Sequence, residues 1–274
     1  MLIVIVITLI AVGALGWWLL IETEGVYLGR RVVILLYDLY AGRYDRTKAF
    51  EPEFDFALLA VPIMNAIEPY CTPLVLDVAT GTGRLPKALL SHARFNGHII
   101  GIDLSRRMLH QAAENLADTR DWVDLMHAPA ENLPFVDASF DVVTCLEALE
   151  FFSDLKVVLQ EMMRVLRPGG LLLVTNRINT RWMPGRTYNA NEFMALLAEF
   201  GLCNVYTEPW QIDYQRVWAR KPGTYSPSEP VPLHRILRCP CGSERLDVER
   251  PCQQCGRVLQ VGADDILEWV RGIQ

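Results

Sequence analysis

Residues 74–84 of this 274-residue chain, LVLDVATGTGR, decide its fold class. The first five predict a buried strand, and Gly81-Thr82-Gly83 predict a tight turn that opens a helix. Because glycine has no Cβ, such a turn lets a ligand approach the backbone and the amides of the following helix. Asp103 lies twenty residues after Gly83, which is the spacing at which an acid binds ribose hydroxyls. We therefore expect an adenosine-type ligand, and Asp77 favours one with an ammonium or sulfonium group.

The chain around this turn alternates short β-branched runs with longer helical patterns. Strands are predicted at 74–78, 98–102, 123–127, 142–146 and 171–175, with two weaker strands around Val205 and Val217. Helices are predicted over 154–166, with Ser153 as N-cap, and over 191–200, closed by Gly201. Strands and helices that alternate along a chain are typical of a parallel sheet. We predict a Rossmann-like α/β fold with a seven-stranded, mostly parallel sheet.

Four segments follow one another in a defined order: 76–83 (LDVATGTG), 101–105 (GIDLS), 130–143 (AENLPFVDASFDVV) and 164–170 (RVLRPGG). Together they resemble the motifs of class I S-adenosylmethionine-dependent methyltransferases. Upstream, residues 37–45 (YDLYAGRYD) resemble the tyrosine-containing helix that often covers the cofactor in that family. The similarity spans about residues 37–220. It is greatest to the branch that includes ubiquinone and menaquinone biosynthesis methyltransferases.

The resemblance implies a site for S-adenosylmethionine. The glycine loop and Asp77 would face its methionine part, Asp103 its ribose and the Ala130 backbone its adenine. The cofactor-binding residues that the resemblance implies are Tyr44, Asp77, Ala79, Gly81, Gly83, Asp103, Leu104, Ala130, Glu131 and Leu146. One departure concerns Pro129, which stands where the family often has an aspartate that meets the adenine amine. That contact is lost or supplied by another group.

Methyl transfer from a sulfonium needs few side chains, because the methyl group is already activated and positioning supplies much of the rate. A general base is needed only if the acceptor must lose a proton. Glu147 and Glu150 follow the fourth predicted strand, where acceptors approach in this fold, and they are the candidates. The alternative is that both are solvated carboxylates that open a loop. His127 is interpreted as a polar residue at a strand end.

Residues 1–20, MLIVIVITLIAVGALGWWLL, contain no charged side chain. A helix of this length crosses a bilayer core of about 30 Å, and tryptophans such as Trp17 and Trp18 sit at headgroup level. We predict a retained single-pass membrane anchor over residues 1–21. A cleaved signal peptide ending near 14–16 (ALG) is the alternative, although no basic residue precedes the apolar run. A buried core helix is disfavoured because the segment is apolar on every face.

The charges that follow this segment predict its orientation. The cations Arg30, Arg31, Arg43, Arg46 and Lys48 all lie after it, and none precedes it. The positive-inside tendency therefore predicts a catalytic domain in the cytoplasm. The stretch 30–40 is either a helix at the membrane interface or the first core helix of the next domain.

Four of the seven cysteines form two close pairs near the C-terminus: Cys239 with Cys241, and Cys252 with Cys255, each pair followed by glycine. This pattern predicts a structural zinc site of the ribbon type, with all four thiolates as ligands. Disulfides are the alternative, which a cytoplasmic location disfavours. The module resembles small zinc ribbons attached to some rRNA and tRNA methyltransferases, one of which is a separate activating subunit. Cys71, Cys145 and Cys203 are interpreted as small buried hydrophobic residues.

We predict five segments: a transmembrane anchor (1–21), a juxtamembrane segment (22–36), the methyltransferase domain (37–220), a Pro/Ser-rich linker (221–233) and the zinc-ribbon-like module (234–274). Three functions stay open. The first is a membrane-anchored methyltransferase of a small or lipophilic acceptor. The second is an RNA or protein methyltransferase that engages its substrate through the ribbon, and the third is a non-catalytic cofactor-binding scaffold. The net charge of −6 disfavours nucleic acid, so the first function is the prediction.

Overall fold

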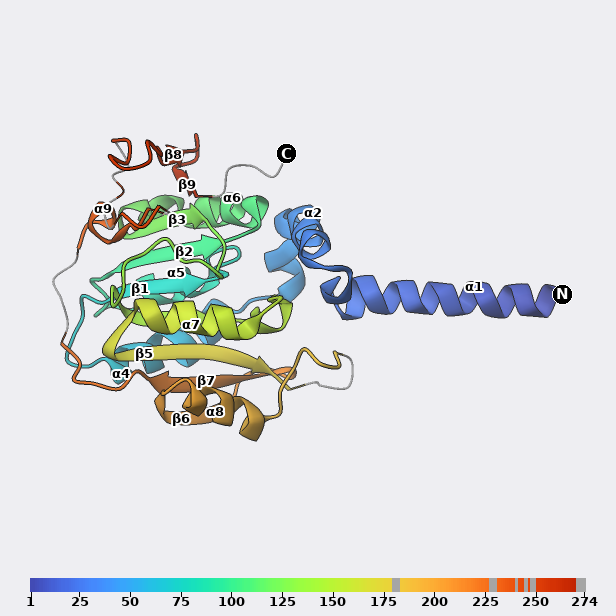
Figure 1. The fold of residues 1–274 in the computed structure, drawn as a ribbon. Helices are drawn as coiled ribbons and strands as arrows, with labels where there is room; N and C mark the ends of the chain where they lie inside the picture. The colour runs from blue at the N-terminus through green and yellow to red at the C-terminus, as the bar shows by residue number, and fades with distance from the viewer. Residues whose placement is uncertain (179–182, 227–230, 240, 244–245, 247–249, 270–274) are drawn as a thin grey trace.

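The computed structural model describes residues 1–178, 183–226, 231–239, 241–243, 246 and 250–269 (Figure 1). Within these residues one sheet holds nine strands in the order β6-β7-β5-β4-β1-β2-β3-β9-β8. The strands are β1 (Leu74–Val78), β2 (His98–Asp103), β3 (Val123–His127), β4 (Phe140–Cys145), β5 (Leu166–Arg177), β6 (Cys203–Pro209), β7 (Tyr214–Arg220), β8 (Gln260–Val261) and β9 (Ile266–Glu268). All seven predicted strands are present, and the predicted Rossmann-like α/β fold is confirmed.

Helices cover both faces of the sheet. The α-helices are α1 (Leu2–Trp17), α2 (Arg30–Lys48), α3 (Pro52–Asp55), α4 (Val61–Ala66), α5 (Arg84–Leu90), α6 (Arg106–Asn115), α7 (Leu155–Val165), α8 (Ala190–Glu199) and α9 (Leu233–Ile236). Single helical turns are η1 (Trp18–Glu22), η2 (Val26–Leu28), η3 (Phe56–Ala60), η4 (Ala117–Trp122) and η5 (Leu149–Phe151). Apolar residues of α4, α5 and α6 form the core on one face, and those of α7 and α8 form the core on the other.

The strand count differs from the prediction because the C-terminal segment joins the sheet. β9 pairs in parallel with β3, so that Leu125 lies opposite Ile266 and His127 opposite Glu268. Without this strand, β3 would present an open edge with unpaired backbone groups. Leu237, Leu259 and Leu267 add to the core on the α7 face. The C-terminal module therefore contacts the sheet directly; residues 227–230 of the predicted linker lie outside the described residues.

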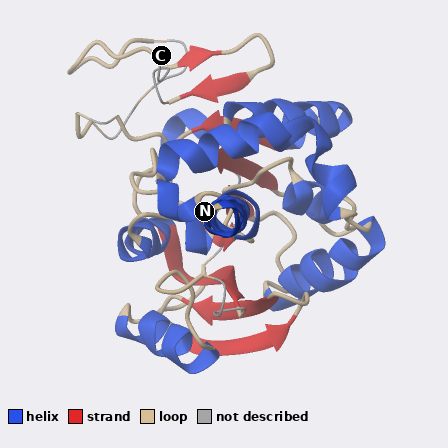
Figure 2. Cartoon of the chain, turned by 90° about the vertical axis from the view of Figure 1, so that its right-hand side faces the viewer, coloured by secondary structure: helices blue, strands red, loops and turns tan. Residues whose placement is uncertain are grey.

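The N-terminal helix projects from the domain (Figure 1). The continuous helical segment Leu2–Glu22 contains an 18-residue window with a mean hydropathy of 2.6, and none of that window is buried. The absence of burial excludes a core helix, which leaves an anchor or a signal sequence. α1 leaves the domain at the edge toward which β5 points, and Figure 2 shows it end-on in front of that edge.

α2 continues the chain after a short turn and packs over the same edge of the sheet. The predicted boundary between residues 36 and 37 falls inside this helix. Ala41 is its only buried residue among those described, so α2 is a covering helix rather than a core helix. Of the three isolated cysteines, Cys145 is buried, whereas Cys71 and Cys203 are exposed. That interpretation was wrong for Cys71 and Cys203, because the first lies in the loop before β1 and the second starts the edge strand β6.

Candidate active site

A cavity of about 850 Å³ lies at the carboxyl ends of β1, β2, β3 and β4, beneath α2. It is lined by eight of the ten predicted cofactor residues: Tyr44, Ala79, Gly81, Asp103, Leu104, Ala130, Glu131 and Leu146. Asp77 lines an adjoining hollow of about 380 Å³ together with Tyr44 and Gly81. Gly83 lines neither hollow. The φ of Gly83 is +85°, which disfavours any residue with a side chain, and a Cβ there would lie 2.8 Å from Leu116 Cδ1.

Asp103 connects the glycine loop to the second strand. Its carboxylate accepts hydrogen bonds from the Gly81 N–H at 2.9 Å and from the Ser105 N–H at 2.8 Å. Burial raises the pKa of Asp103. Each carboxylate oxygen keeps a further lone pair, so the group can still accept from hydroxyls in the cavity. The predicted loop and acid are therefore held at one point of the cavity wall.

Asp77 is buried beneath the glycine loop. Its two carboxylate oxygens accept hydrogen bonds of 2.7 Å from the hydroxyls of Thr80 and Thr144. Burial raises its pKa to about 6, although both hydrogen bonds act in the opposite direction. A carboxylate held in this way gains from a cationic ligand, because a nearby positive charge favours its ionised form.

α2 is held over the cavity by its own acids. Asp38 accepts a hydrogen bond of 2.6 Å from the Ser105 hydroxyl. Asp45 accepts one of 2.5 Å from the hydroxyl of Thr82, inside the glycine loop. These contacts place the aromatic rings of Tyr37 and Tyr44 in the cavity wall. The motif 37–45 thus covers the cavity, as the resemblance implied.

The far end of the cavity is formed by the residues that follow β3. Ala128, Ala130 and Glu131 line it, and the Glu131 carboxylate lies 3.4 Å from the Arg30 guanidinium. His127 lies behind this wall: its Nδ1 is 2.9 Å from the Glu268 carboxylate and its Nε2 is 3.1 Å from the Leu104 carbonyl oxygen. His127 therefore positions the backbone of Leu104, which agrees with its interpretation as a strand-end residue.

Glu147 lies at the junction of the two hollows and lines both. Its carboxylate accepts hydrogen bonds from Arg84 at 2.6 Å, from Gln211 at 3.0 Å and from Lys48 at 3.2 Å. Its backbone has a φ of +52°, a strained conformation of the kind found at functional sites.

Glu150 lies behind Glu147 and outside the cavity lining, where it contacts Tyr214 and Arg177. Burial raises its pKa. Glu147 is only 9% exposed, and Glu150 is only 2% exposed. The alternative of two solvated carboxylates is therefore wrong, because Lys48, Arg84 and Tyr214 cover the loop.

A cluster around Arg84 was not predicted from the sequence. Its guanidinium donates to Asp55 at 2.8 and 2.6 Å and also to Glu147. It lies between the rings of Phe50 and Trp210, at 4.0 and 4.7 Å from their centroids. The one feature of the sequence that could have indicated this cluster is that Arg84, a cation, directly follows the glycine loop. The cluster holds Glu147 at the mouth of the smaller hollow.

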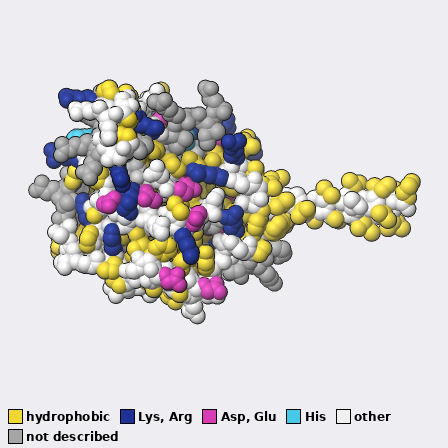
Figure 3. Space-filling view, in the orientation of Figure 1, with side chains coloured by type: hydrophobic (Ala, Val, Ile, Leu, Met, Phe, Trp, Pro, Cys, Tyr) yellow, Lys and Arg dark blue, Asp and Glu magenta, His cyan; other side chains and the backbone are white. Residues whose placement is uncertain are grey.

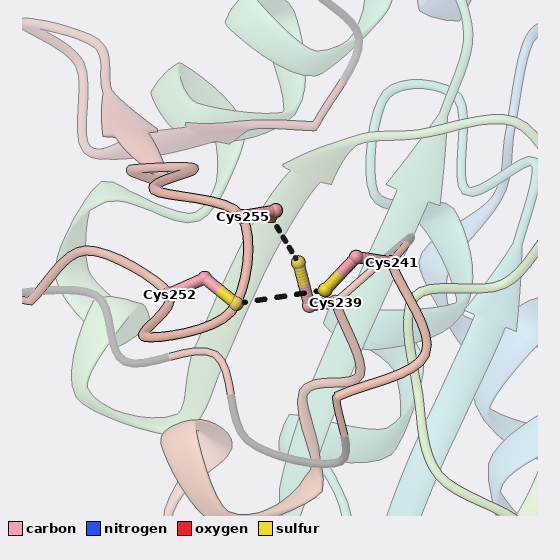
Figure 4. Close-up of side chains that lie close together, drawn as sticks. All are labelled: Cys239, Cys241, Cys252 and Cys255. Carbon is pink, nitrogen blue, oxygen red and sulfur yellow. Dashed lines mark hydrogen bonds between the residues drawn. The ribbon is translucent and has the colours of Figure 1, made fainter.

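The four predicted metal ligands come together in the C-terminal module (Figure 4). Their sulfur atoms all lie within 4.8 Å of one another. Cys239 Sγ is 3.4 Å from Cys255 Sγ, and Cys241 Sγ is 3.6 Å from Cys252 Sγ. A tetrahedral Zn²⁺ with Zn–S bonds of about 2.3 Å separates its sulfurs by about 3.8 Å, so the cluster has the size of a zinc site.

Backbone N–H groups point into both turns of the cluster. A backbone hydrogen bond closes the turn after the first cysteine of each pair. The Gly242 N–H donates to the Cys239 carbonyl at 2.9 Å, and the Gly256 N–H donates to the Cys252 carbonyl at 2.8 Å. Backbone N–H groups of Cys255 and Gln254 lower the pKa of the Cys252 thiol to about 6, whereas burial raises the pKa of the Cys239 thiol to about 12. All seven cysteines are free. These donors and distances fit a four-thiolate metal centre.

The fold and the cavity together define a Rossmann-like protein with an adenosine-type site. The family model described as "Methyltransferase domain" matches residues 76–174. Demethylmenaquinone methyltransferase of Porphyromonas gingivalis is 32% identical over 176 residues, which are 60% of this chain and 69% of the relative. Demethylmenaquinone methyltransferase of Clavibacter sepedonicus is 34% identical over 142 residues, which are 52% of this chain and 56% of the relative.

Solved structures show the same fold. The complex between the Haloferax volcanii Trm112 methyltransferase activator and its methyltransferase aligns with a TM-score of 0.54 at 20% identity, over 68% of this chain and 98% of the matched chain. The chain belongs to the class I S-adenosylmethionine-dependent methyltransferases. The chain spans little more than half of the Clavibacter relative and about two thirds of the Porphyromonas one.

Cofactor affinity is expected to depend on pH through Asp77. Its pKa lies near 6 in the folded protein, so the free protein holds a proton there at lower pH. Binding a cationic ligand favours the ionised carboxylate and must release that proton. We expect the affinity for S-adenosylmethionine to be constant above about pH 7 and to fall by up to about tenfold per pH unit below about pH 6.

Titration calorimetry between about pH 5 and pH 8 measures this dependence. Asp77→Asn keeps the shape of the side chain and removes its charge. We therefore expect this variant to bind S-adenosylmethionine weakly and its affinity to change less with pH. Asp103 faces the same cavity, and burial raises its pKa too. Any pH dependence of the affinity that remains in Asp77→Asn is therefore attributed to Asp103. A wild-type affinity that does not change across this range would contradict the role of Asp77.

Proposed function

We propose that this protein transfers a methyl group from S-adenosylmethionine to a small or lipophilic acceptor of the quinol type, beside a membrane. The names of the two relatives support this acceptor class. The observation that carries the membrane part is geometric: the cavity opens at the carboxyl edge of the sheet, and the apolar helix leaves the domain at that same edge (Figure 2). The bound cofactor supplies an activated methyl group.

The residues around the cavity have distinct roles in this proposal. Asp103 accepts hydrogen bonds from the ribose hydroxyls, and Asp77 favours the cationic methionine part. α2 covers the site and excludes water through Tyr37 and Tyr44. Glu147 is the candidate base, because it alone of the two predicted glutamates lines the cavity. Lys48 and Arg84 form ion pairs with its carboxylate and fix its position beside the cavity.

The acceptor is tested by following a radiolabelled methyl group into a lipid extract, a small-molecule fraction, RNA and protein. We expect label in the lipid extract or the small-molecule fraction. Label in RNA or protein would instead establish the substrate class suggested by the resemblance to ribbons of RNA methyltransferases. Bound cofactor without label in any fraction would indicate a non-catalytic scaffold.

The base is tested with Glu147→Gln, which keeps the size of the side chain. We expect cofactor affinity to be retained while kcat falls by roughly 100-fold, the usual contribution of a general base. An unchanged kcat would show that the acceptor needs no base at this position.

We propose that α1 is a retained anchor, that the domain lies in the cytoplasm and that membrane contact is made through this helix. The cations that follow α1, from Arg30 to Lys48, support this orientation. Protease added to intact cells is expected to leave the domain undigested, and to digest it after lysis. Digestion in intact cells would reverse the orientation, and a mature N-terminus near Trp17 would identify α1 as a signal peptide.

We also propose that the four-cysteine cluster binds one structural Zn²⁺. Four thiolates complete a tetrahedral coordination sphere, so no position stays open for a substrate. The metal would stabilise a module that is too small to bury a sufficient core by itself. Because β9 of this module pairs with β3, the metal would also stabilise the edge of the sheet.

A further inference from the structure

A second groove lies beside the cofactor cavity, where the apolar helix meets α2. It holds about 930 Å³ of space, part of it open to solvent, and its walls are mostly apolar. Its walls come from the end of the N-terminal helix and from one face of α2: Leu20, Ile21, Leu36, Leu39 and Tyr40. Tyr37 and Tyr44 line both this groove and the cofactor cavity. The two spaces are therefore neighbours separated by two aromatic rings.

The apolar wall of the groove is open to the surroundings. Leu39 is 68% exposed and Ile21 is 63% exposed. Their apolar surface continues that of α1, which projects as a rod covered with hydrophobic side chains (Figure 3). An apolar surface of this kind is unfavourable in water but favourable at a bilayer. With α1 in a membrane, the groove would open at the level of the headgroups, near Trp17 and Trp18.

The inner end of the groove is polar. Glu24 and Lys48 line it, and Glu24 accepts a hydrogen bond of 2.6 Å from the Tyr37 hydroxyl. The Lys48 ammonium group lies 3.2 Å from the carboxylate of Glu147, the candidate base. The groove thus runs from an apolar opening to charged groups beside the cofactor cavity. These walls suit a ligand that has a hydrocarbon chain and a polar head.

We infer that this groove binds the hydrocarbon chain of a membrane-dissolved acceptor, which enters sideways from the bilayer. The acceptor's hydroxylated ring would lie at the inner end, near Lys48 and Glu147, while its chain lies along Leu36 and Leu39. This inference rests on the proposed function, because it assumes that the acceptor is lipophilic. It adds the route of entry and the residues that select for a chain.

The inference is tested by equilibrium binding of two probes to the full chain in one detergent at a fixed concentration. The probes are 1-naphthol and the same ring with a decyl chain. The decyl probe is expected to bind at least tenfold more tightly to the wild type, since apolar contact with the groove adds to its affinity. Equal affinities after correction for partition into detergent would overturn the inference.

Two variants on α2 separate the groove from general contact with detergent. Leu39→Asn changes a residue of the groove, whereas Leu35→Asn changes a residue that is 56% exposed and outside its lining. Both introduce the same side chain into the same helix. We expect Leu39→Asn to weaken the decyl probe about fivefold and to leave 1-naphthol unchanged, and Leu35→Asn to change neither. An equal loss for both variants would mean that only the micelle contacts these residues.

A third measurement tests whether the groove also binds the acyl chains of a phospholipid. A diacyl phospholipid added as competitor is expected not to displace the decyl probe; displacement at equal concentration would make the groove a lipid site and overturn the inference. Because these measurements need no methyl transfer, their outcome is independent of the labelling experiment. Label in RNA together with selective binding of the decyl probe would reject the proposed function and leave the groove as a chain-binding site.

Discussion

Removing the metal from the four-cysteine cluster is expected to unfold the C-terminal module and to weaken cofactor binding about tenfold. Structural zinc contributes about 10–16 kcal/mol of apparent free energy in small peptides. A flexible linker, as predicted over residues 221–233, would let the two units melt separately. The structure leads to the opposite expectation, because Trp269 donates a backbone hydrogen bond of 3.1 Å to His127 and Arg106 pairs with Asp264 and Glu268.

These contacts connect the C-terminal module, which holds the four-cysteine cluster, to the cavity. Glu268 lies 2.9 Å from the His127 ring, and the other ring nitrogen lies 3.1 Å from the carbonyl of Leu104, a residue of the cavity wall. Arg106 is the first residue of α6, directly after Ser105. Loss of β9 would release His127 and Arg106 together and loosen the wall at the ribose end.

The measurement compares Cys252→Ser with Cys203→Ser, which changes an exposed cysteine outside the cluster. Metal content, hydrogen exchange of β3 and cofactor affinity are followed in both. Cys252→Ser is expected to lose metal, protection and affinity, and Cys203→Ser to keep all three. Glu268→Gln should keep the metal and still lose affinity. Unchanged affinity in metal-free protein would show that the module is an independent unit, and a Cys–Cys bridge in place of metal would reject zinc.

Gly81→Val is expected to lower cofactor affinity by roughly 100-fold or more, equal to about 2.7 kcal/mol. A Cβ at Gly81 would meet no heavy atom within 4 Å, so the added side chain occupies open space beside the cavity that Gly81 lines. The ligand then cannot approach the loop backbone. The loss is steric and does not depend on a contact inside the protein.

The backbone of Gly81 adds a cost of its own, because its φ of +57° is unfavourable for a residue with a side chain. Gly201→Val is the matched control: its φ is +81°, it has equally open space, and it lies after α8, outside the cavity lining. Both variants are expected to lose a similar amount of stability in thermal unfolding. Only Gly81→Val should lose binding by calorimetry. Equal affinities in the two folded variants would show that the ligand does not approach this loop.

Much of the fold was predictable because it depends on local patterns. A strand that is buried on both faces favours a mainly apolar run such as Leu74–Val78, in which Asp77 is the one polar residue, and a positive φ at Gly81 favours glycine. β1 and β3 therefore have the bounds that were predicted. The cofactor loop and Asp103 were predictable for the same reason, since their spacing follows from one strand, one turn and one helix.

The surroundings of Glu147 were not predictable. Its partners Arg84 and Lys48 come from the start of α5 and the end of α2, which are 63 and 99 residues away in the sequence. A parallel sheet places the carboxyl ends of its strands along one edge, and only their register decides which side chains meet there. The burial of Glu150 behind Tyr214 has the same origin.

The sequence by itself determined the family, the glycine loop with its acid, the apolar N-terminal segment and the spacing of the four cysteines, since each is a pattern within one stretch of chain. Only the tertiary structure decided that the C-terminal module completes the sheet, that Arg84 and Lys48 hold Glu147, and that an apolar groove lies beside the cavity where α2 meets the apolar helix. Each of these depends on contacts between segments far apart in the sequence. Such contacts follow from packing and strand pairing, which no local periodicity encodes.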